Sequence, residues 1–385
     1  MILVSLLLVI LAVFGAPLFT IIATSAMVGF QSNDTSLMTI ALELLSISQM
    51  PVLTAIPLFT FAGYLLSESN APGRLVRLTS ALFGWMPGGL ALVNVISSTL
   101  FGAISGSAVA ATSAIGGFMI PAMKKEGYDP AFSAAVSATA STTGMLIPPS
   151  NILIVYAVAS GGVSIAALFV AGYAPGILLA VSIMFVCGIY ARRHGFPAGA
   201  RVPFNVLWRC TLAAVPSLFL IVLVIGGILG GIFTATEAGA IAVLYAWLLS
   251  AVFYREISLA DLGQILLKSA ETTAIVMFLV GTSMAMSWLL AYQNIPTTVA
   301  EALVTLSDNP IIILLLTSIL LITLDLRGNA VFNAARTGFN YIIAPFEVAA
   351  EVITQPAARV WSGITEVDDL TTEMPTSHFL GAQVT

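Results

Sequence analysis

Long apolar runs alternate with short polar connections along most of this sequence. A helix needs roughly 20 residues to cross the apolar core of a bilayer, and most of these runs approach that length. They contain almost no charged residues and lie near 2–30, 51–67, 84–103, 107–123, 131–147, 166–191, 211–232, 236–254, 272–292 and 310–326. The run at 131–147 continues past a pair of prolines. The pattern predicts an all-α fold with about ten membrane segments.

The composition favours a polytopic membrane protein. Of the 385 residues, 59% are hydrophobic and 8% are charged, whereas a soluble domain has roughly 25% charged residues. The run from Met1 to Gln31 has no lysine or arginine and is too long for the apolar region of a signal peptide, so we expect a retained membrane helix. Two amphipathic pieces, 73–83 and 297–306, are expected at the membrane interface. No polybasic block points to nucleic acid as a partner.

Basic residues indicate the topology. They form four clusters, and the segments between successive clusters return the chain to the side that it left. All four clusters therefore fall on one side, which the positive-inside rule makes cytoplasmic. The clusters are Arg74 with Arg77, Lys124 with Lys125, Arg192 and Arg193 with Arg201 and Arg209, and Arg255 with Lys268.

Two short pieces interrupt the uncharged core. The first, 104–110, has small and hydroxylated residues, and we expect it to form the tip of a re-entrant helical hairpin around Ser105-Gly106-Ser107. The second, 143–151, contains Pro148-Pro149, which breaks a helix because proline lacks an N–H and clashes with the preceding turn. Inside a membrane, such breaks are tolerated only where they are buried in protein or line a cavity.

These two breaks together predict a binding site. Carbonyl oxygens released near Gly144 to Ile147, with hydroxyls at the hairpin tip, suit a dehydrated Na⁺. Opposing helix N-termini suit a carboxylate substrate. An alternative interpretation is that Ser-Gly-Ser is only a close-packing face and Pro-Pro only a kink.

The sequence gives little support to an intramembrane enzyme. It has no paired intramembrane carboxylates, no histidine cluster and no serine–histidine pair within the apolar runs. His194 and His378 are too few and too peripheral for a metal centre, and we expect neither a disulfide nor a metal site at Cys187 and Cys210. We expect no cofactor, no resident metal beyond Na⁺ as a coupling ion, and no enzymatic activity.

Several motifs occur in order along the chain: Ile56-Pro57-Leu58-Phe59 with Gly63, the stretch from Gly102 to Ala110, Ile120-Pro121-Ala122-Met123, the stretch from Gly127 to Phe132, Ile147-Pro148-Pro149-Ser150, and the stretch from Gly231 to Ala238. With these motifs, residues 1–320 closely resemble the large membrane subunit of tripartite ATP-independent periplasmic (TRAP) transporters. Ala235 stands where the family usually has proline, and we expect only a local change in helix entry there.

The resemblance implies an elevator-type transporter of inverted repeats in the bacterial inner membrane, driven by a Na⁺ gradient. It also implies two protein partners, a small membrane subunit and a periplasmic substrate-binding protein, and organic acids such as C4-dicarboxylates as substrates. By motif position, the sodium-binding residues would be Ser105, Ser107, Gly144, Ile147 and Pro149, mainly through backbone oxygens. The substrate cavity would be lined by Gly106, Thr112, Thr143 and Asn151, although the polar side chains among them are equally well explained as helix-packing groups.

Two acidic residues are expected to cap helices. Glu237 follows Thr234 and Thr236 at a predicted helix start, where a carboxylate favours the positive end of the helix dipole. Glu271 is placed at the start of the next predicted helix, where the same capping role is expected. A direct transport role is the alternative for Glu237.

The family pattern stops near Leu324. We expect a first transporter repeat over 1–200, an incomplete second repeat over 201–325 and an atypical polar tail over 326–385. The tail, from about residue 317, weakly resembles the N-terminal region of a rod-shape-determining protein. Because the second half-site would then be missing, we expect the chain alone to insert without transporting. The alternative function is a structural membrane scaffold, or a fusion with a cell-shape protein segment.

Overall fold

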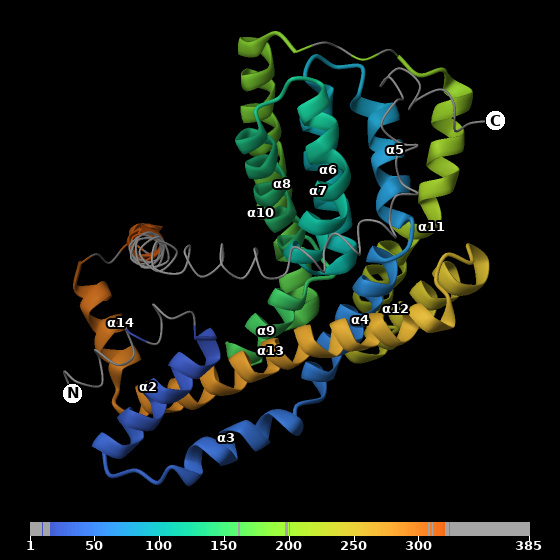
Figure 1. Ribbon diagram of the computed structural model, residues 1–385. Coiled ribbons are helices and arrows are strands. Elements are labelled where there is room, and N and C mark those ends of the chain that lie inside the picture. Colours follow the sequence, from blue (N-terminus) through green and yellow to red (C-terminus); the bar gives the residue numbers. More distant parts are fainter. Residues whose placement is uncertain are drawn as a thin grey trace, which may run out of the picture. The chain divides into compact units, whose positions relative to one another are not determined.

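The computed structural model describes residue 10 and residues 16–160, 162–196, 199, 201–306, 309, 311–319 and 323. Every regular element in this part of the chain is a helix (Figure 1). Residues 311–319 are helical as well. The named elements are α2 (Leu18–Ser32), α3 (Met38–Ser48), η1 (Pro51–Thr54), α4 (Ala55–Ser67), α5 (Ala71–Phe83), α6 (Gly89–Ser105), α7 (Ala108–Lys125), α8 (Pro130–Leu146), α9 (Asn151–Ala159), α10 (Ile165–His194), α11 (Phe204–Leu229), α12 (Ala235–Trp247), η2 (Leu248–Phe253), α13 (Leu259–Tyr292) and α14 (Ile295–Leu306).

The chain divides into two compact units, one formed from residues 1–43 and 281–385 and the other from residues 44–280. In the first unit, the ring of Phe30 on α2 stacks on Trp288 with ring centroids 5.2 Å apart. Trp288 in turn stacks on Tyr292 at 5.3 Å. These aromatic contacts hold α2 against the last turns of α13.

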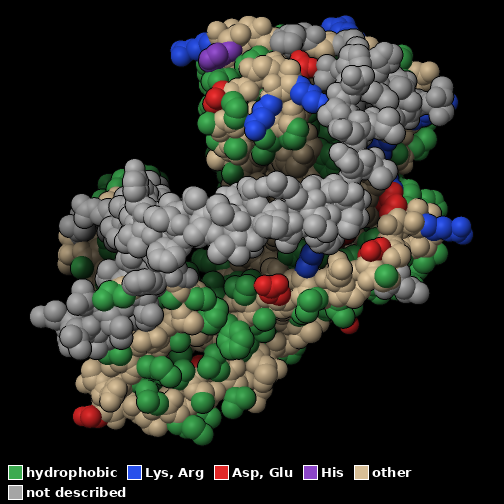
Figure 2. Space-filling view, viewed as in Figure 1, with side chains coloured by type: hydrophobic (Ala, Val, Ile, Leu, Met, Phe, Trp, Pro, Cys, Tyr) green, Lys and Arg blue, Asp and Glu red, His purple; other side chains and the backbone are tan. Residues whose placement is uncertain are grey.

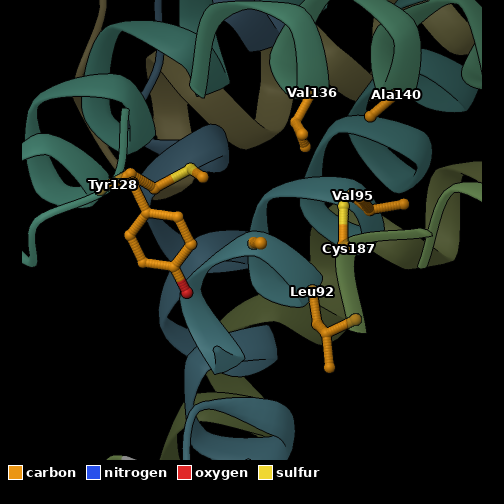
Figure 3. Packing of buried hydrophobic residues seen from close by; sticks show 8 residues of the cluster. Leu92, Val95, Tyr128, Val136, Ala140 and Cys187 are labelled. Carbon is orange, nitrogen blue, oxygen red and sulfur yellow. The ribbon is translucent and has the colours of Figure 1, made fainter. Parts of the chain in front are cut away.

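The second unit is built around α6, α7, α8 and α10, which pack side by side (Figure 1). Small residues let these helices approach closely, as is usual where membrane helices pack. Figure 3 shows the buried hydrophobic cluster that joins α6 to α8 and α10. Its members include Leu92, Val95, Val136, Ala140 and Cys187. Tyr128, from the connection before α8, closes one side of this cluster.

The termini of several helices carry the capping groups that their sequences predict. Asp129 precedes α8, and its carboxylate accepts a hydrogen bond from the Phe132 N–H at 3.0 Å. Thr234 and Glu237 form a reciprocal capping box at the start of α12. The capping role predicted for Glu237 is therefore confirmed.

Four described helices are long and apolar enough to cross a membrane, or up to six if each of two bent helix pairs counts as one span. Exposed side chains on these helices are largely apolar, such as Leu178 and Phe185 on α10. In Figure 2, hydrophobic side chains spread over much of the visible surface, whereas charged ones are few and scattered. Such a surface is typical of a protein that lies in lipid. The figure of about ten segments stays a prediction.

The structure differs from the sequence-based prediction at two helices. α3 has no counterpart among the predicted segments, because Glu43 interrupts an otherwise apolar stretch. α13 begins at Leu259, well before the predicted start near 272. Glu271 therefore lies inside α13, and its predicted capping role is wrong. Asp261 caps instead, since its carboxylate accepts the Ser258 N–H at 3.0 Å. The predicted tail, 326–385, lies outside the described residues.

Candidate functional site

The predicted hairpin is present, with its tip at Ser105, Gly106 and Ser107. α6 ends at Ser105, and Gly106 then adopts a left-handed conformation (φ 62°) that turns the chain back. Ser107 caps α7, since its Oγ accepts a hydrogen bond from the Ala110 N–H at 3.3 Å. The Ser105 Oγ donates to the Ser107 carbonyl at 3.3 Å, which fixes the shape of the tip.

The predicted helix break is also present. α8 ends at Leu146, α9 begins at Asn151, and the two helices are bent by 53°. Pro148 lies four residues after Gly144, and Pro149 lies four residues after Met145. The two prolines are joined by a cis peptide bond. Because proline has no N–H, both of those carbonyls lose their helical donor.

The carbonyls of Gly144 and Met145 differ in whether another group donates a hydrogen bond in place of the missing N–H. The Ser150 Oγ donates to the Met145 carbonyl and also accepts from the Leu153 N–H, so it both repairs the end of α8 and caps α9. The Gly144 carbonyl receives no such replacement from the described residues. Gly144 therefore keeps a carbonyl oxygen available at the break.

The C-terminal end of α6 has free carbonyls for a related reason. The last turn of a helix lacks donors for its final carbonyls. Among the described residues, only the Gly102 carbonyl of this turn has a backbone donor, the Gly106 N–H at 2.8 Å. The Ser107 N–H, which would continue the helix pattern, turns to the Ser105 Oγ at 3.5 Å. The ends of α6 and α8 thus both present carbonyl oxygens.

Direct backbone contacts bring the hairpin and the break together. A Cβ placed on Gly144 would lie 2.5 Å from the Gly102 Cα, so α6 and α8 touch through their backbones. A Cβ on Gly106 would lie 3.6 Å from the Pro149 carbonyl oxygen and 3.4 Å from the Asn151 Nδ2. The tip and the break therefore form one place in the structure.

α4 completes this place from the other side. Gly63 packs directly against the Ser105 backbone. Thr60, one turn earlier, accepts a hydrogen bond from the Asn151 Nδ2 at 3.1 Å. The Asn151 Oδ1 is buried and has no hydrogen-bond partner among the described residues. An unpaired buried acceptor is costly, so this oxygen is a candidate ligand atom.

The predicted site residues do not all contribute equally. Ser105, Ser107, Gly144, Pro149, Gly106 and Asn151 lie at the junction of the tip and the break, and Ile147 lies in the break, where its side chain faces Gly176 of α10. Thr143 is fully buried, and its Oγ1 donates to the Thr139 carbonyl of its own helix at 3.4 Å. Thr112 is partly buried in the second turn of α7. The structure does not join either threonine to the junction by a hydrogen bond.

The sequence analysis did not assign Thr60, Gly63 or Gly102 to the site, although Gly63 and Gly102 belong to the motifs that carry the family resemblance. A hydroxyl in the middle of an apolar run was an available signal for Thr60. The two glycines contact backbones from distant parts of the sequence, and that contact leaves no local pattern.

The junction contains no charged side chain, because 90–123 and 130–191 include no Asp, Glu, Lys or Arg. Two helix C-termini supply partial negative charge, and the N-termini of α7 and α9 supply partial positive charge. Divalent ions such as Ca²⁺ and Mg²⁺ usually require carboxylates. A set of neutral oxygens therefore suits a monovalent cation, and the nearby N–H groups suit an anion.

The comparison with protein families decides what kind of protein this is. Residues 2–331 match the model of the tripartite ATP-independent periplasmic transporter, DctM component. The chain belongs to this family.

Individual relatives agree with this assignment. The chain is 48% identical over 270 residues to an uncharacterized protein, YgiK, of Salmonella typhimurium. It is 34% identical over 306 residues to the C4-dicarboxylate TRAP transporter large permease protein DctM of Rhodobacter capsulatus, and 36% identical over 272 residues to the 2,3-diketo-L-gulonate TRAP transporter large permease protein YiaN of Escherichia coli.

The matches cover only part of each protein. They include 70%, 76% and 70% of this DctM-family chain, and 62%, 70% and 64% of the three relatives, respectively. The family and the apolar helices together establish a multi-pass membrane protein.

Proposed function

We propose that this chain is the large membrane subunit of a Na⁺-coupled secondary transporter that imports organic acids. The observation that carries the proposal is the junction of the hairpin tip with the helix break. There, free carbonyls and the unpaired Asn151 Oδ1 offer a cage for a dehydrated cation. Two relatives are named for their substrates, C4-dicarboxylates and 2,3-diketo-L-gulonate, and these support an organic acid.

The ion site is assigned to backbone and hydroxyl oxygens of Ser105, Ser107, Gly144, Ile147 and Pro149. The substrate would lie beside Gly106 and Asn151, with its carboxylate at the first N–H groups of α7 and α9. Thr112 and Thr143 remain weaker candidates for this cavity. Na⁺ bound at the carbonyl ends raises the local positive potential, so it would strengthen carboxylate binding. That linkage is the physical basis for symport.

The family description supports the remaining parts of the proposal. A tripartite periplasmic system implies a small membrane subunit and a periplasmic binding protein as partners. The bacterial inner membrane follows as the location, and an inverted-repeat elevator of about ten segments as the mechanism. The expectation that this chain does not transport, even with both partners, also stays a proposal, because the second half-site that it expects to be missing would lie outside the described residues. Na⁺-driven accumulation by the chain with both partners would contradict it.

A cysteine-protection experiment tests the proposed function without requiring a full transport cycle. Val109 is exposed in the first turn of α7, next to the hairpin tip. In a chain with Cys187 and Cys210 replaced by alanine, Na⁺ should slow the labelling of Val109→Cys, and K⁺ should not. A C4-dicarboxylate should slow it further only when Na⁺ is present.

Val163→Cys provides the matched control, because Val163 is also exposed but lies in the connection between α9 and α10, outside the hairpin and the helix break. Labelling at Val163→Cys should not respond to either solute. Equal effects of Na⁺ and K⁺ at Val109→Cys, or protection by the dicarboxylate without Na⁺, would refute the proposed coupling.

A further inference from the structure

An apolar groove of about 710 Å³ lies beside α11, α12 and η2, away from the residues of the ion site. Its volume falls within the range of roughly 300–1,000 Å³ that is usual for small-molecule sites. All of its lining residues belong to the second unit. They are Pro216, Tyr245, Leu248, Leu249, Val252, Phe253 and Arg255.

A hydrogen bond joins the two sides of the groove. The Tyr245 hydroxyl donates to the Pro216 carbonyl at 2.8 Å. Leu249 is buried and forms part of the floor, while Val252 and Phe253 are exposed by 52% and 73%. These two lie in η2, a π-helical turn. Such turns are rare and often mark functional places in a helix.

One end of the groove carries positive charge. Arg255 is exposed and has a left-handed backbone (φ 55°), which non-glycine residues rarely adopt. The adjacent Glu256 does not neutralise it, because this carboxylate is held by the Arg74 guanidinium and by the Asn70 N–H at 2.9 Å. The Tyr254 hydroxyl donates to the Ala213 carbonyl at 3.4 Å, which joins the end of η2 to α11 beside Arg255.

The position of the groove indicates which kind of ligand fits it. α11 and the helix formed by α12 with η2 are both candidate membrane spans, and Arg255 lies two residues after Phe253, the last residue of the second span. The groove therefore runs along the apolar zone and ends in a cation at its edge. Arg255 also belongs to a basic cluster predicted to be cytoplasmic, and the cytoplasmic leaflet is the one whose anionic lipids attract basic residues.

We propose that this groove binds an anionic phospholipid. An acyl chain lies over Leu249, Val252 and Phe253, and the headgroup phosphate contacts Arg255. Zwitterionic lipids fit less well because their own cation opposes the arginine.

Lipid binding to the purified full chain in detergent tests the proposal. Native mass spectrometry should show retention of phosphatidylglycerol in preference to phosphatidylcholine. Arg255→Gln should weaken phosphatidylglycerol binding about fivefold, as expected for the loss of one basic residue near an anionic surface. Val252→Trp, which fills the groove, should abolish the preference.

Two controls separate binding from misfolding. Arg192→Gln removes an exposed arginine at the end of α10, and Val222→Trp enlarges an exposed valine on α11 that does not line the groove. Both should bind phosphatidylglycerol like the unmodified chain, and all four variants should elute as single species.

Three results would overturn the proposal. The first is unchanged phosphatidylglycerol binding in both groove variants. The second is that inorganic phosphate alone stabilises the chain as much as phosphatidylglycerol does, which would mean an anion site without acyl contact. The third is photo-crosslinking from position 252 to a second polypeptide instead of lipid when the chain is isolated with its membrane, which would assign the groove to a partner helix.

Discussion

At the scale of single residues, the contact between Gly102 and Gly144 controls the geometry of the proposed ion site. A methyl group on Gly144 would lie 2.5 Å from the Gly102 Cα and 2.9 Å from the Ala103 nitrogen. Neither neighbour is a flexible side chain, so α6 and α8 would have to separate. Overpacking of this kind costs about 1–3 kcal/mol.

We therefore expect Gly144→Ala to lower the free energy of unfolding by that amount, measured by circular dichroism during titration with a denaturing detergent. Gly117→Ala is the matched control, because Gly117 is in α7 and has no atom within 4 Å of its added Cβ. It should be neutral or stabilising, since alanine favours a helix over glycine by roughly 1 kcal/mol. Equal stabilities of the two variants would contradict the close packing.

Tyr128 gives a second residue-scale prediction, based on pH. Burial raises the pKa of Tyr128 to about 12, opposed by a backbone hydrogen bond at Ala91. A raised pKa in the folded state stabilises the fold below the unfolded pKa, and this contribution is lost as pH rises through the folded pKa. The unfolding free energy should therefore fall between about pH 10 and pH 12.

Tyr128→Phe should show a shallower fall over that range than the unmodified chain. Tyr156→Phe, at an exposed position on α9, should follow the unmodified chain. If Tyr128→Phe and the unmodified chain lose stability in parallel, Tyr128 does not contribute this linkage.

Residue types and spacing predicted part of the site but not its assembly. The sequence predicted a hairpin tip at Ser105, Gly106 and Ser107, because these small and hydroxylated residues lie inside an uncharged run. Pro148 predicted the helix break, because proline lacks the N–H that would continue the helix. Thr60, by contrast, reaches Asn151 across 91 positions of sequence. Contacts of that range depend on how helices pack, which local patterns do not encode.

At the scale of elements, helix boundaries followed the sequence where capping signals were strong. Asp129 with Pro130 marked the start of α8, and Thr234 with Glu237 marked the start of α12. α13 was misjudged because its first turns carry polar residues such as Gln264 and Lys268, which concealed its length from a search for apolar runs. The helix continues regardless, since those residues have good helix propensity.

The corner between α4 and α5 is tied to the segment from η2 to α13 by two ion pairs of different burial. Arg74 and Glu256 have side chains exposed by only 7% and 22%, whereas Lys268 and Glu68 are exposed by 52% and 43%. Arg74 also lies over the Tyr254 ring, 3.5 Å from its centroid. Arg74, one of the basic residues used to predict the topology, is thus a buried residue that links α5 to Glu256.

Breaking the buried pair should cost much more than breaking the exposed one. Arg74→Gln leaves the Glu256 carboxylate without its cation, and such losses cost about 3–5 kcal/mol. Lys268→Gln should cost at most about 1 kcal/mol. Unfolding free energies of the two variants, measured side by side, check this order. Similar costs for both would mean that Arg74 does not act as a buried link to Glu256.

At the scale of the whole molecule, composition alone established a membrane protein, and ordered motifs indicated the family that the comparison then confirmed. The physical reason for the site is that two helices end, and two begin, at one uncharged place. Each helix end is ordinary when taken separately. We propose that their convergence creates one place where oxygens bind a cation and N–H groups bind an anion.

Equilibrium binding of ²²Na⁺ to the purified chain tests whether the junction binds a cation. We expect saturable binding that K⁺ does not displace, and weaker binding in Ser105→Ala and in Pro148→Ala, which returns a helical donor to the Gly144 carbonyl. Ser164→Ala, which removes the cap of α10, should bind like the unmodified chain. Absence of saturable ²²Na⁺ binding, or binding unchanged in both site variants, would contradict a cation site at the junction.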